Sequence, residues 1–499
     1  MKKLHILLAS AFVLSSCAIN EPELKEENTT NPVLNSTEKT VAQKNVTNIQ
    51  TNQNSPVNKT NPVVVAQPTK TELPKKQEII SVKDKQINVA EDYNTETVLV
   101  GIKTEKDHVK ALEILSKYNL KQENFMKGIN VISVTSTGKN VPELLKKLND
   151  EKFFAFVETD NLSINKPEQD SEVVDSIFNI FGVLDYNDKY YKDQYALKSL
   201  RLPEAWGFST GKNTTIAIID SGVDFNHADL KNKTVPGYDA FAQKEGAKGG
   251  DVSNLNYLYS VYKHGSHVAG IAAAEANNSK GIVGVAPDAK IMPIKIFPGF
   301  PELFKTSKKN TDGSDITVVS AIADGIVWAV DHKADVINMS LGVWEPSITI
   351  EKAVKYALDH NVSVIVAAGN ERANGNRRNY LGAINGVVAV GATDKDDKIT
   401  FFSNSGDYVT VAAPGYEIIS TTPSILKLKE YRKMSGTSMA SPEVAGVAAL
   451  LRSKFGEKAT PAWIKERLQK TATDLGEPGR DDLYGNGLVN TLKALSDPE

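Results

Sequence analysis

The sequence predicts an α/β protein in which a small α+β module precedes a large domain. The large domain is expected to have a doubly wound, mostly parallel sheet with helices on both faces. Toward the C-terminus, short apolar runs such as "TTIAIID", "VSVIVAAGN" and "GVVAVGAT" alternate with helical stretches. Strands this apolar are typical of parallel sheets covered on both faces. Before them, strand-like and helix-like segments alternate over about 65 residues, as in a small α+β module.

The N-terminus has the pattern of an export signal. Two lysines precede the apolar stretch Leu4–Leu14, which is too short to span a bilayer. Small residues follow, and then Cys17, the single cysteine of the 499 residues. This pattern resembles the bacterial lipobox, in which a signal peptidase cuts before the cysteine and lipid is attached to its sulfur. We predict a lipoprotein signal peptide over residues 1–16 and lipidation of Cys17, with an ordinary secretion signal as the alternative.

The segment after Cys17 is polar. Between Ala18 and Asp92 there is no Gly, Phe, Tyr or Trp. Such a segment cannot bury enough apolar surface to offset the entropy lost on ordering. We therefore expect residues 17–92 to form a disordered polar tether. The formal net charge of −3 gives no basic bias, so no nucleic acid is expected as a partner.

Regular structure is expected next along the chain. "TVLVGIK", "INVISVTS" and "FFAFVETD" alternate like strands, and helical stretches separate them. The first helix follows Thr104, with Asp107 as its capping partner. Strand, helix, strand, helix and strand predict a ferredoxin-like module over residues 93–166. Residues 167–187 would link it to the large domain, residues 188–499.

Two segments of the large domain place an acid and a histidine where ligands bind in such folds. "IAIIDSGVD" ends an apolar strand at Asp220, and ligands bind beyond the carboxyl ends of strands in doubly wound sheets. "KHGSHVAGIAAA" starts a helix with His264 in its first turn and His267 one turn later. Spacing does not choose between these histidines. A histidine pair at i and i+3 also suits a metal site, although few further ligands are available.

Two further segments carry an amide and a hydroxyl. "VIVAAGN" ends a strand at Asn370, whose amide can donate to a developing negative charge, although a structural turn explains it equally well. In "SGTSMASPEVAGVAALL", Gly436 permits a tight turn and Ser438 starts a helix rich in small residues. The free N–H groups and partial positive charge of a helix N-terminus suit a hydroxyl that attacks a carbonyl. A helix cap is the plainer explanation of Ser438 alone.

Together the four motifs resemble those of the subtilisin-like serine peptidases, the subtilase family, and their order is that of the subtilisin triad. The resemblance selects His264 over His267, because the family's catalytic histidine precedes the glycine of this motif. It implies that Asp220 orients His264 and that His264 takes the proton of Ser438. Asn370 and the Ser438 N–H would hold the oxyanion. The implied reaction is endopeptidase hydrolysis of proteins or peptides through an acyl-enzyme, without a catalytic cofactor.

The resemblance also implies a substrate groove. "NMSLG" is similar to the family strand that pairs with an extended peptide. The implied substrate-binding residues are Ser340, Leu341, Gly342, Ala368 and Gly369.

Some residues depart from the family pattern. Ser266 stands for Thr in the histidine motif, Glu443 stands where His is frequent, and Lys263 replaces a small or acidic residue. The loop Phe297–Asp312 is longer and more basic than the family minimum. These departures concern substrate preference and not the reaction.

Family members commonly carry calcium near the start of the catalytic domain. Asp229 in "NHADL" and Asn278 in "EANNSKGIVGVAP" match side-chain ligands of that site, and Asp188 is a further candidate. Carboxylate and amide oxygens suit Ca²⁺, while Lys280 in the same loop is a discordant charge. The resemblance therefore implies a structural calcium ion at these three residues.

The small module resembles the inhibitory propeptide of many subtilisin-like enzymes, especially in "VPELLKKLNDEKFFAFVETD". Such a propeptide places its C-terminal strand in the active cleft and is then cut away. Because Cys17 precedes it, the sequence predicts an exported zymogen with a lipid anchor in the cell envelope, at the outer membrane if the source cell has one. Its catalytic domain would be shed, or held by the cleaved propeptide.

Two other functions stay open at this point. One is a catalytically silent surface lipoprotein that binds peptides in the same groove, and the other is an esterase that uses Ser438. The complete set of motifs and the propeptide-like module favour peptidolysis.

Overall fold

The computed structural model describes the following parts of the chain: residues 97–135, 141–159, 162–164, 186–252, 261–297, 315–317, 319–423 and 430–496. All of them belong to one compact unit. The predicted signal peptide, Cys17, the tether, nearly all of the linker 167–187 and nearly all of the loop Phe297–Asp312 lie outside the described residues. Of the described helices, none has the length and apolar character needed to cross a bilayer.

The small module is a four-stranded antiparallel sheet with two helices. Its strands follow the order β2-β3-β1-β4, and the β-α-β-β-α-β chain order confirms the ferredoxin-like prediction. One strand, β2, was not predicted, because Lys121 and Glu123 interrupt its apolar alternation. The elements are β1 (Thr97–Gly101), α2 (His108–Lys117), β2 (Lys121–Met126), β3 (Val131–Thr135), α3 (Val141–Asp150) and β4 (Phe156–Thr159).

The capping pair predicted for the first helix of the module is present. The Thr104 N–H donates to Asp107 Oδ2 over 3.0 Å, and the Thr104 hydroxyl donates to the same oxygen over 2.9 Å. These bonds enclose a short 3₁₀ turn, η3 (Glu105–Asp107), which leads into α2.

The large domain has an eight-stranded sheet in the order β14-β13-β12-β11-β6-β9-β7-β8. All neighbours are parallel except β7 and β8, which confirms the predicted, mostly parallel architecture. The strands are β6 (Thr215–Asp220), β7 (Gly237–Asp239), β8 (Lys244–Gly246), β9 (Lys290–Lys295), β11 (Val336–Met339), β12 (Ser363–Ala367), β13 (Val388–Thr393) and β14 (Val409–Pro414).

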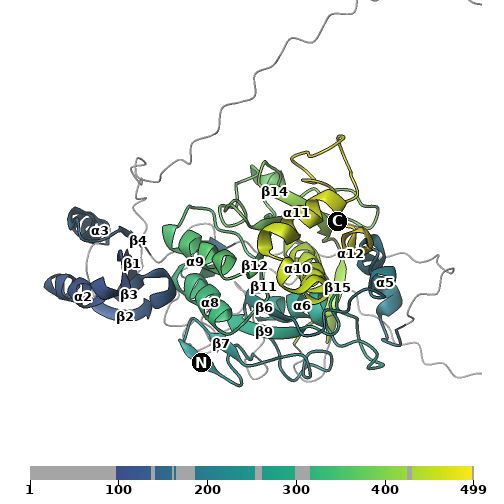
Figure 1. The fold of residues 1–499 in the computed structure, drawn as a ribbon, viewed down its shortest axis with the longest axis horizontal. Coiled ribbons are helices and arrows are strands. Elements are labelled where there is room, and N and C mark those ends of the chain that lie inside the picture. The colour runs from purple at the N-terminus through teal and green to yellow at the C-terminus, as the bar shows by residue number, and fades with distance from the viewer. Residues whose placement is uncertain are drawn as a thin grey trace, which may run out of the picture. The chain divides into compact units, whose positions relative to one another are not determined.

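Helices cover both faces of this sheet. In β6, Ile216 and Ile218 belong to the same core as α6 and α10, whereas Ala217 and Ile219 belong to the core of α8 and α9. Figure 1 shows α8 and α9 on one side of the central strands and α6 on the other. Both faces of the strands are therefore buried, which explains their continuous apolar runs. The helices are α4 (Tyr195–Ser199), α5 (Leu202–Ala205), α6 (Val261–Ala273), α8 (Val319–Asp331), α9 (Ile348–Asp359), α10 (Thr437–Phe455), α11 (Pro461–Thr471) and α12 (Thr491–Ser496).

Two small antiparallel ribbons and four 3₁₀ turns in addition to η3 complete the described elements. The first ribbon pairs β5, at the end of the module, with β10 of the large domain. The second pairs β15 with β16. Their bounds are β5 (Leu162–Ile164), β10 (Asp315–Thr317), β15 (Ile418–Thr421) and β16 (Tyr431–Met434), and the turns are η4 (Lys127–Ile129), η5 (Tyr191–Asp193), η6 (Arg372–Asn374) and η7 (Gly456–Lys458).

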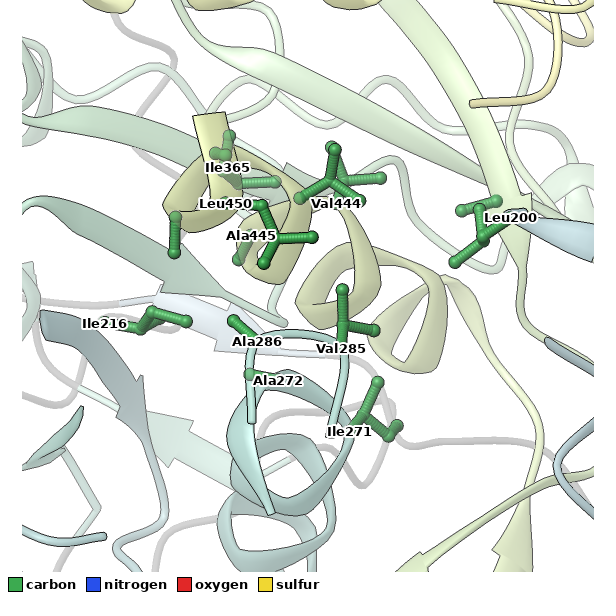
Figure 2. Packing of buried hydrophobic residues seen from close by; sticks show 14 of the residues in the cluster. Leu200, Ile216, Ile271, Ala272, Val285, Ala286, Ile365, Val444, Ala445 and Leu450 are labelled. Atoms are coloured by element: carbon green, nitrogen blue, oxygen red, sulfur yellow. The ribbon is translucent and has the colours of Figure 1, made fainter. Parts of the chain in front are cut away.

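The small residues of α10 let this central helix approach its neighbours closely. A Cβ on Gly446 would lie 2.6 Å from Val285 Cβ, which is closer than such atoms approach one another. Figure 2 shows Val285 and Ala286 beneath Ala445 of α10, with α6 beyond them. This packing fixes the position of the helix that carries Ser438 at its start.

Candidate active site

Asp220 and His264 meet where β6 ends and the first turns of α6 begin. His264 Nδ1 lies 2.9 Å from each carboxylate oxygen of Asp220, and the Ser221 N–H donates to Asp220 Oδ1 over 2.6 Å. A glycine is needed for this approach, because a Cβ on Gly265 would lie 2.3 Å from Gly222 O. The carboxylate is almost fully buried and the imidazole is largely buried. The pair can therefore accept a proton at Nε2 and stabilise the resulting imidazolium.

His267, the other histidine of the motif, faces a different part of the protein. Its Nε2 lies 3.0 Å from Arg432 O on β16. Complete burial lowers its pKa to about 3, so the ring is neutral. Since His264 faces Asp220 and His267 faces a backbone carbonyl, the geometry gives no support to a metal site made by the two. Among the described residues there is no cluster of three or more His, Cys, Asp or Glu side chains suited to a metal ion.

Ser438 occupies the first turn of α10, after Gly436 at the N-cap. Its hydroxyl donates to Ser340 O over 3.3 Å. In return, Ser340 Oγ donates to Ser438 O over 2.8 Å. Ser438 is thus placed against the segment that follows β11. In the described part of the chain its hydroxyl has this one hydrogen-bond partner, and not His264.

Asn370 follows β12 and points its amide toward the start of α10. Its Oδ1 accepts from both the N–H and the hydroxyl of Thr437, each over 2.9 Å. Thr437 Oγ1 also accepts from the Gly369 N–H over 3.1 Å. With Oδ1 occupied in this way, the Asn370 amide N–H₂ is left to donate elsewhere.

The absence of a side chain at Gly436 leaves a space between two N–H donors. A Cβ on Gly436 would lie 3.3 Å from Asn370 Nδ2 and 3.6 Å from Ser438 N. An oxyanion placed there would meet donors from both residues, which is the arrangement that stabilises tetrahedral intermediates.

Side chains that the sequence analysis did not single out hold these groups together. Asn338 Nδ2 donates to Ser340 Oγ over 3.0 Å, and Ser441 Oγ donates to Asn338 Oδ1 over 2.7 Å. This chain of bonds joins β11 to α10 beneath Ser438. Asn338 lies inside the motif "NMSLG" and Ser441 inside "SMASP". Their place in these motifs is the sequence signal from which their role could have been predicted. Thr437 likewise lies inside "SGTSMA".

The predicted substrate-binding residues form two facing segments. Ser340, Leu341 and Gly342 follow β11, and Ala368 and Gly369 follow the neighbouring parallel strand β12. Asn379 spans the gap between the segments: its Nδ2 donates to Ala367 O over 2.8 Å and to Leu341 O over 3.3 Å. No sequence motif pointed to Asn379, because it lies in a loop of polar residues.

The three predicted calcium ligands lie together in another part of the domain. Asn278 Nδ2 donates to Asp229 Oδ1 over 2.8 Å, and the Asn278 N–H donates to Asp188 Oδ1 over 3.3 Å. Burial, opposed by backbone hydrogen bonds and reinforced by the charge of Asp229, raises the pKa of Asp188. Neither carboxylate has an ion-pair partner among the described residues, and the Lys280 side chain is exposed. Two buried carboxylates beside an amide fit Ca²⁺ chemically, although the Asn278 amide would have to turn its oxygen inward.

Comparisons with known proteins show which family the chain is similar to. A sequence model of the Subtilase family matches residues 211–487. A thermophilic serine proteinase of Bacillus sp. (strain AK1) is 39% identical over 313 residues, which are 62% of this chain and 69% of that protein. Thermitase of Thermoactinomyces vulgaris is 37% identical over 310 residues, 62% of this chain and 98% of thermitase.

Longer alignments were also found. Subtilisin E of Bacillus subtilis (strain 168) is 32% identical over 389 residues, which are 77% of this chain and 86% of that protein. The crystal structure of fervidolysin from Fervidobacterium pennivorans, a keratinolytic enzyme related to subtilisin, superimposes with a TM-score of 0.69 at 30% identity. That superposition covers 81% of this chain but only 61% of fervidolysin.

Proposed function

The chain belongs to the subtilase family and is a subtilisin-type serine endopeptidase, and we propose that Asp220, His264 and Ser438 form its catalytic triad. The 2.9 Å contacts between His264 Nδ1 and Asp220 carry this proposal. Asp220 holds the Nδ1–H, so that Nε2 is the base. For attack, the Ser438 hydroxyl leaves Ser340 O and turns toward His264, which takes its proton and later gives it to the leaving amine.

Asn370 and the Ser438 N–H form the oxyanion hole in this mechanism. The substrate carbonyl oxygen enters the space left by Gly436 and becomes negatively charged when Ser438 attacks. Thr437 fixes the Asn370 amide beforehand, so little reorganisation is needed during the reaction. Water then hydrolyses the acyl-enzyme through the same groups.

The substrate is a protein or peptide bound in extended form. Its backbone pairs with Ser340, Leu341 and Gly342, and Ala368 and Gly369 border the residue that precedes the scissile bond. The hydrogen bond between Ser438 and Ser340 O supports this placement, because it puts the nucleophile at the end of the pairing segment.

Residues 93–166 act as an inhibitory propeptide in this proposal. Glu158 of β4 accepts bonds from the Ser347 hydroxyl and from the N–H groups of Ile348 and Thr349, at 2.9–3.1 Å. It thereby supplements Ser347, the N-cap residue of α9, with a carboxylate at the helix N-terminus. The pairing of β5 with β10 adds a second contact between the module and the large domain. The subtilisin E alignment spans more residues than 188–499 contains, so it too includes residues before Asp188.

The enzyme is made as an exported, lipid-anchored zymogen. The lipid is attached to Cys17 after removal of residues 1–16, and the tether 17–92 holds the folded part away from the membrane. Cleavage between about Lys166 and Lys192 then separates the catalytic domain from its anchor. The sequence pattern around Cys17 supports this part of the proposal.

A structural calcium ion, when bound, is held by Asp188, Asp229 and Asn278. The buried carboxylates and the amide support this assignment. The ion would neutralise their charge and brace the start of the catalytic domain, and it takes no part in the reaction.

Hydrolysis of matched peptide and ester substrates by the purified protein tests the proposed activity. Cleavage within the peptide by the wild type, lost in Ser438→Ala, is the expected result. Binding of the peptide without cleavage would identify a silent peptide-binding lipoprotein instead. Turnover of the ester alone would identify an esterase.

A further inference from the structure

In the proposed mechanism, the residue that precedes the scissile bond lies between two backbone segments, and we call the space between them the slot. Ser340–Gly342 forms one wall and Ala368–Asn370 the other, and Asn379 joins the segments behind them. Ser438 contacts the first wall and Asn370 ends the second. When the scissile carbonyl of a substrate is held between Ser438 and Asn370, the side chain of the residue that carries this carbonyl therefore points into the slot. The depth of the slot decides which side chains fit.

One tryptophan fills the space next to a glycine in each wall. A Cβ on Gly342 would lie 2.7 Å from Trp344 Cζ2 and 3.0 Å from its Cη2, and a Cβ on Gly369 would lie 3.1 Å from the same Cη2. A single edge of the indole thus reaches both walls. Trp344 is only 3% exposed, so the ring lies inside the protein and not on its surface.

The indole is held in this position from its other side. The Arg377 guanidinium lies 5.7 Å from the ring centroid, within the range of a cation–π contact. That guanidinium also pairs with Glu345 over 2.8 Å. The Arg377 carbonyl accepts from Asn404 Nδ2 over 2.8 Å, and this Nδ2 would lie 2.5 Å from a Cβ on Gly369. Moving the ring outward would break its contact with the Arg377 guanidinium.

We propose that Trp344 determines the substrate preference by closing the depth of this slot, so that it takes small uncharged side chains such as those of Gly, Ala and Ser. This inference rests on the proposed function, because Ser438 and Asn370 define which residue enters the slot. A phenylalanine or lysine side chain would have to displace a packed indole. A mismatch of one methylene in an apolar pocket already changes selectivity by about 10–200-fold.

The test compares kcat/KM for peptides that differ only in the residue before the scissile bond. The purified wild-type protein, once it labels with a fluorophosphonate probe, should cleave the alanine peptide at least about tenfold better than the phenylalanine peptide. Trp344→Ala should raise the ratio of phenylalanine to alanine cleavage by at least about tenfold, and Trp344→Phe should raise it less. Trp463→Ala is the matched control, since it removes a half-buried indole of α11 that packs on Phe455. Its ratio should equal that of the wild type.

Labelling with a fluorophosphonate probe separates failure of the inference from failure of the proposed function. If the wild type neither labels nor cleaves any peptide, the proposed function is wrong and the inference falls with it. If the wild type labels but cleaves the phenylalanine peptide as well as the alanine peptide, Trp344 does not close the slot. If Trp344→Ala labels but its ratio of phenylalanine to alanine cleavage equals that of the wild type, the proposed role of Trp344 is also refuted. If Trp344→Ala does not label because it misfolds, the ratio of phenylalanine to alanine cleavage in the wild type and in Trp344→Phe tests the proposal instead.

Discussion

Replacing Glu443 by glutamine should remove a pH-dependent loss of stability. Glu443 lies on α10, on the helix that begins at Ser438, and it is 1% exposed. Its Oε2 has no hydrogen-bond partner in the described residues. A cavity of about 10 Å³, lined by residues that include Gln194 and Tyr195, adjoins it and has room for about one water molecule. Burial therefore raises the pKa of this carboxyl well above 4.5.

The sign and size of the effect follow from linkage. Because the pKa of Glu443 is higher in the folded than in the unfolded chain, its protonated form favours folding, and this stability is fully present below about pH 4.5. Above that value the unfolded chain loses its proton first. The free energy of unfolding then falls by about 1.4 kcal/mol per pH unit until the folded-state pKa is reached. Glu443→Gln keeps the shape of the side chain but has no ionisable carboxyl, so its free energy of unfolding lacks this fall with rising pH.

Urea unfolding from pH 4 to pH 8 measures the difference between the Glu443→Gln variant and the protein that keeps Glu443. Both proteins should carry Ser438→Ala, so that self-digestion does not disturb the equilibrium. Only the change of the unfolding free energy with pH is compared, so a constant offset between the two proteins does not affect the result. Parallel curves for the two proteins above pH 5 would show that Glu443 ionises normally in the folded chain. That result would contradict the raised pKa of the buried carboxyl.

Three further predictions concern the proposed site and its neighbours. Asn370→Ala should lower kcat by about 10²–10³-fold with little change in KM, and this magnitude was itself measured on a subtilisin. A change of equal size in kcat and KM would contradict the role assigned to Asn370. Glu158→Ala removes the bonds that Glu158 makes to the start of α9, whose own N-cap Ser347 remains. This loss, worth about 0.5–2 kcal/mol by analogy with a helix cap, should increase fluorophosphonate labelling of the uncleaved chain. Saturating Ca²⁺ at about 100 times its Kd should stabilise the protein by about 2.7 kcal/mol, seen as a raised Tm; a rise of equal size in Asp229→Ala would exclude the proposed ligands.

The sequence predicted the parts of the fold that depend on local apolar patterns. The central strands were recognised because both faces are buried, and the positions of Asp220 and Asn370 followed from the rule that polar ligands lie at the carboxyl ends of such strands. The alternation of β2 was hidden by Lys121 and Glu123, which lie on its more exposed positions. Strands of three residues, such as β7, carry too little pattern to be recognised.

Contacts between distant parts of the chain could not be predicted in the same way. Thr437 was visible in its motif, but its bonds to Asn370 join residues that are 67 positions apart. Trp344 reaches the slot from the loop that follows β11, and Asn379 reaches it from the loop that follows β12. The triad, oxyanion and lipidation assignments remain predictions, because family membership and geometry support them without measuring a reaction.

The most direct measurement of the central claim is fluorophosphonate labelling of cells and medium, with wild type and Ser438→Ala compared. We expect a labelled band near the mass of residues 188–499 in the medium, and no such band in the variant. The N-terminus of that band should lie in or next to the linker 167–187. A labelled chain of nearly full length in the membrane would contradict the propeptide assignment. Absence of any Ser438-dependent label would contradict the catalytic role of Ser438.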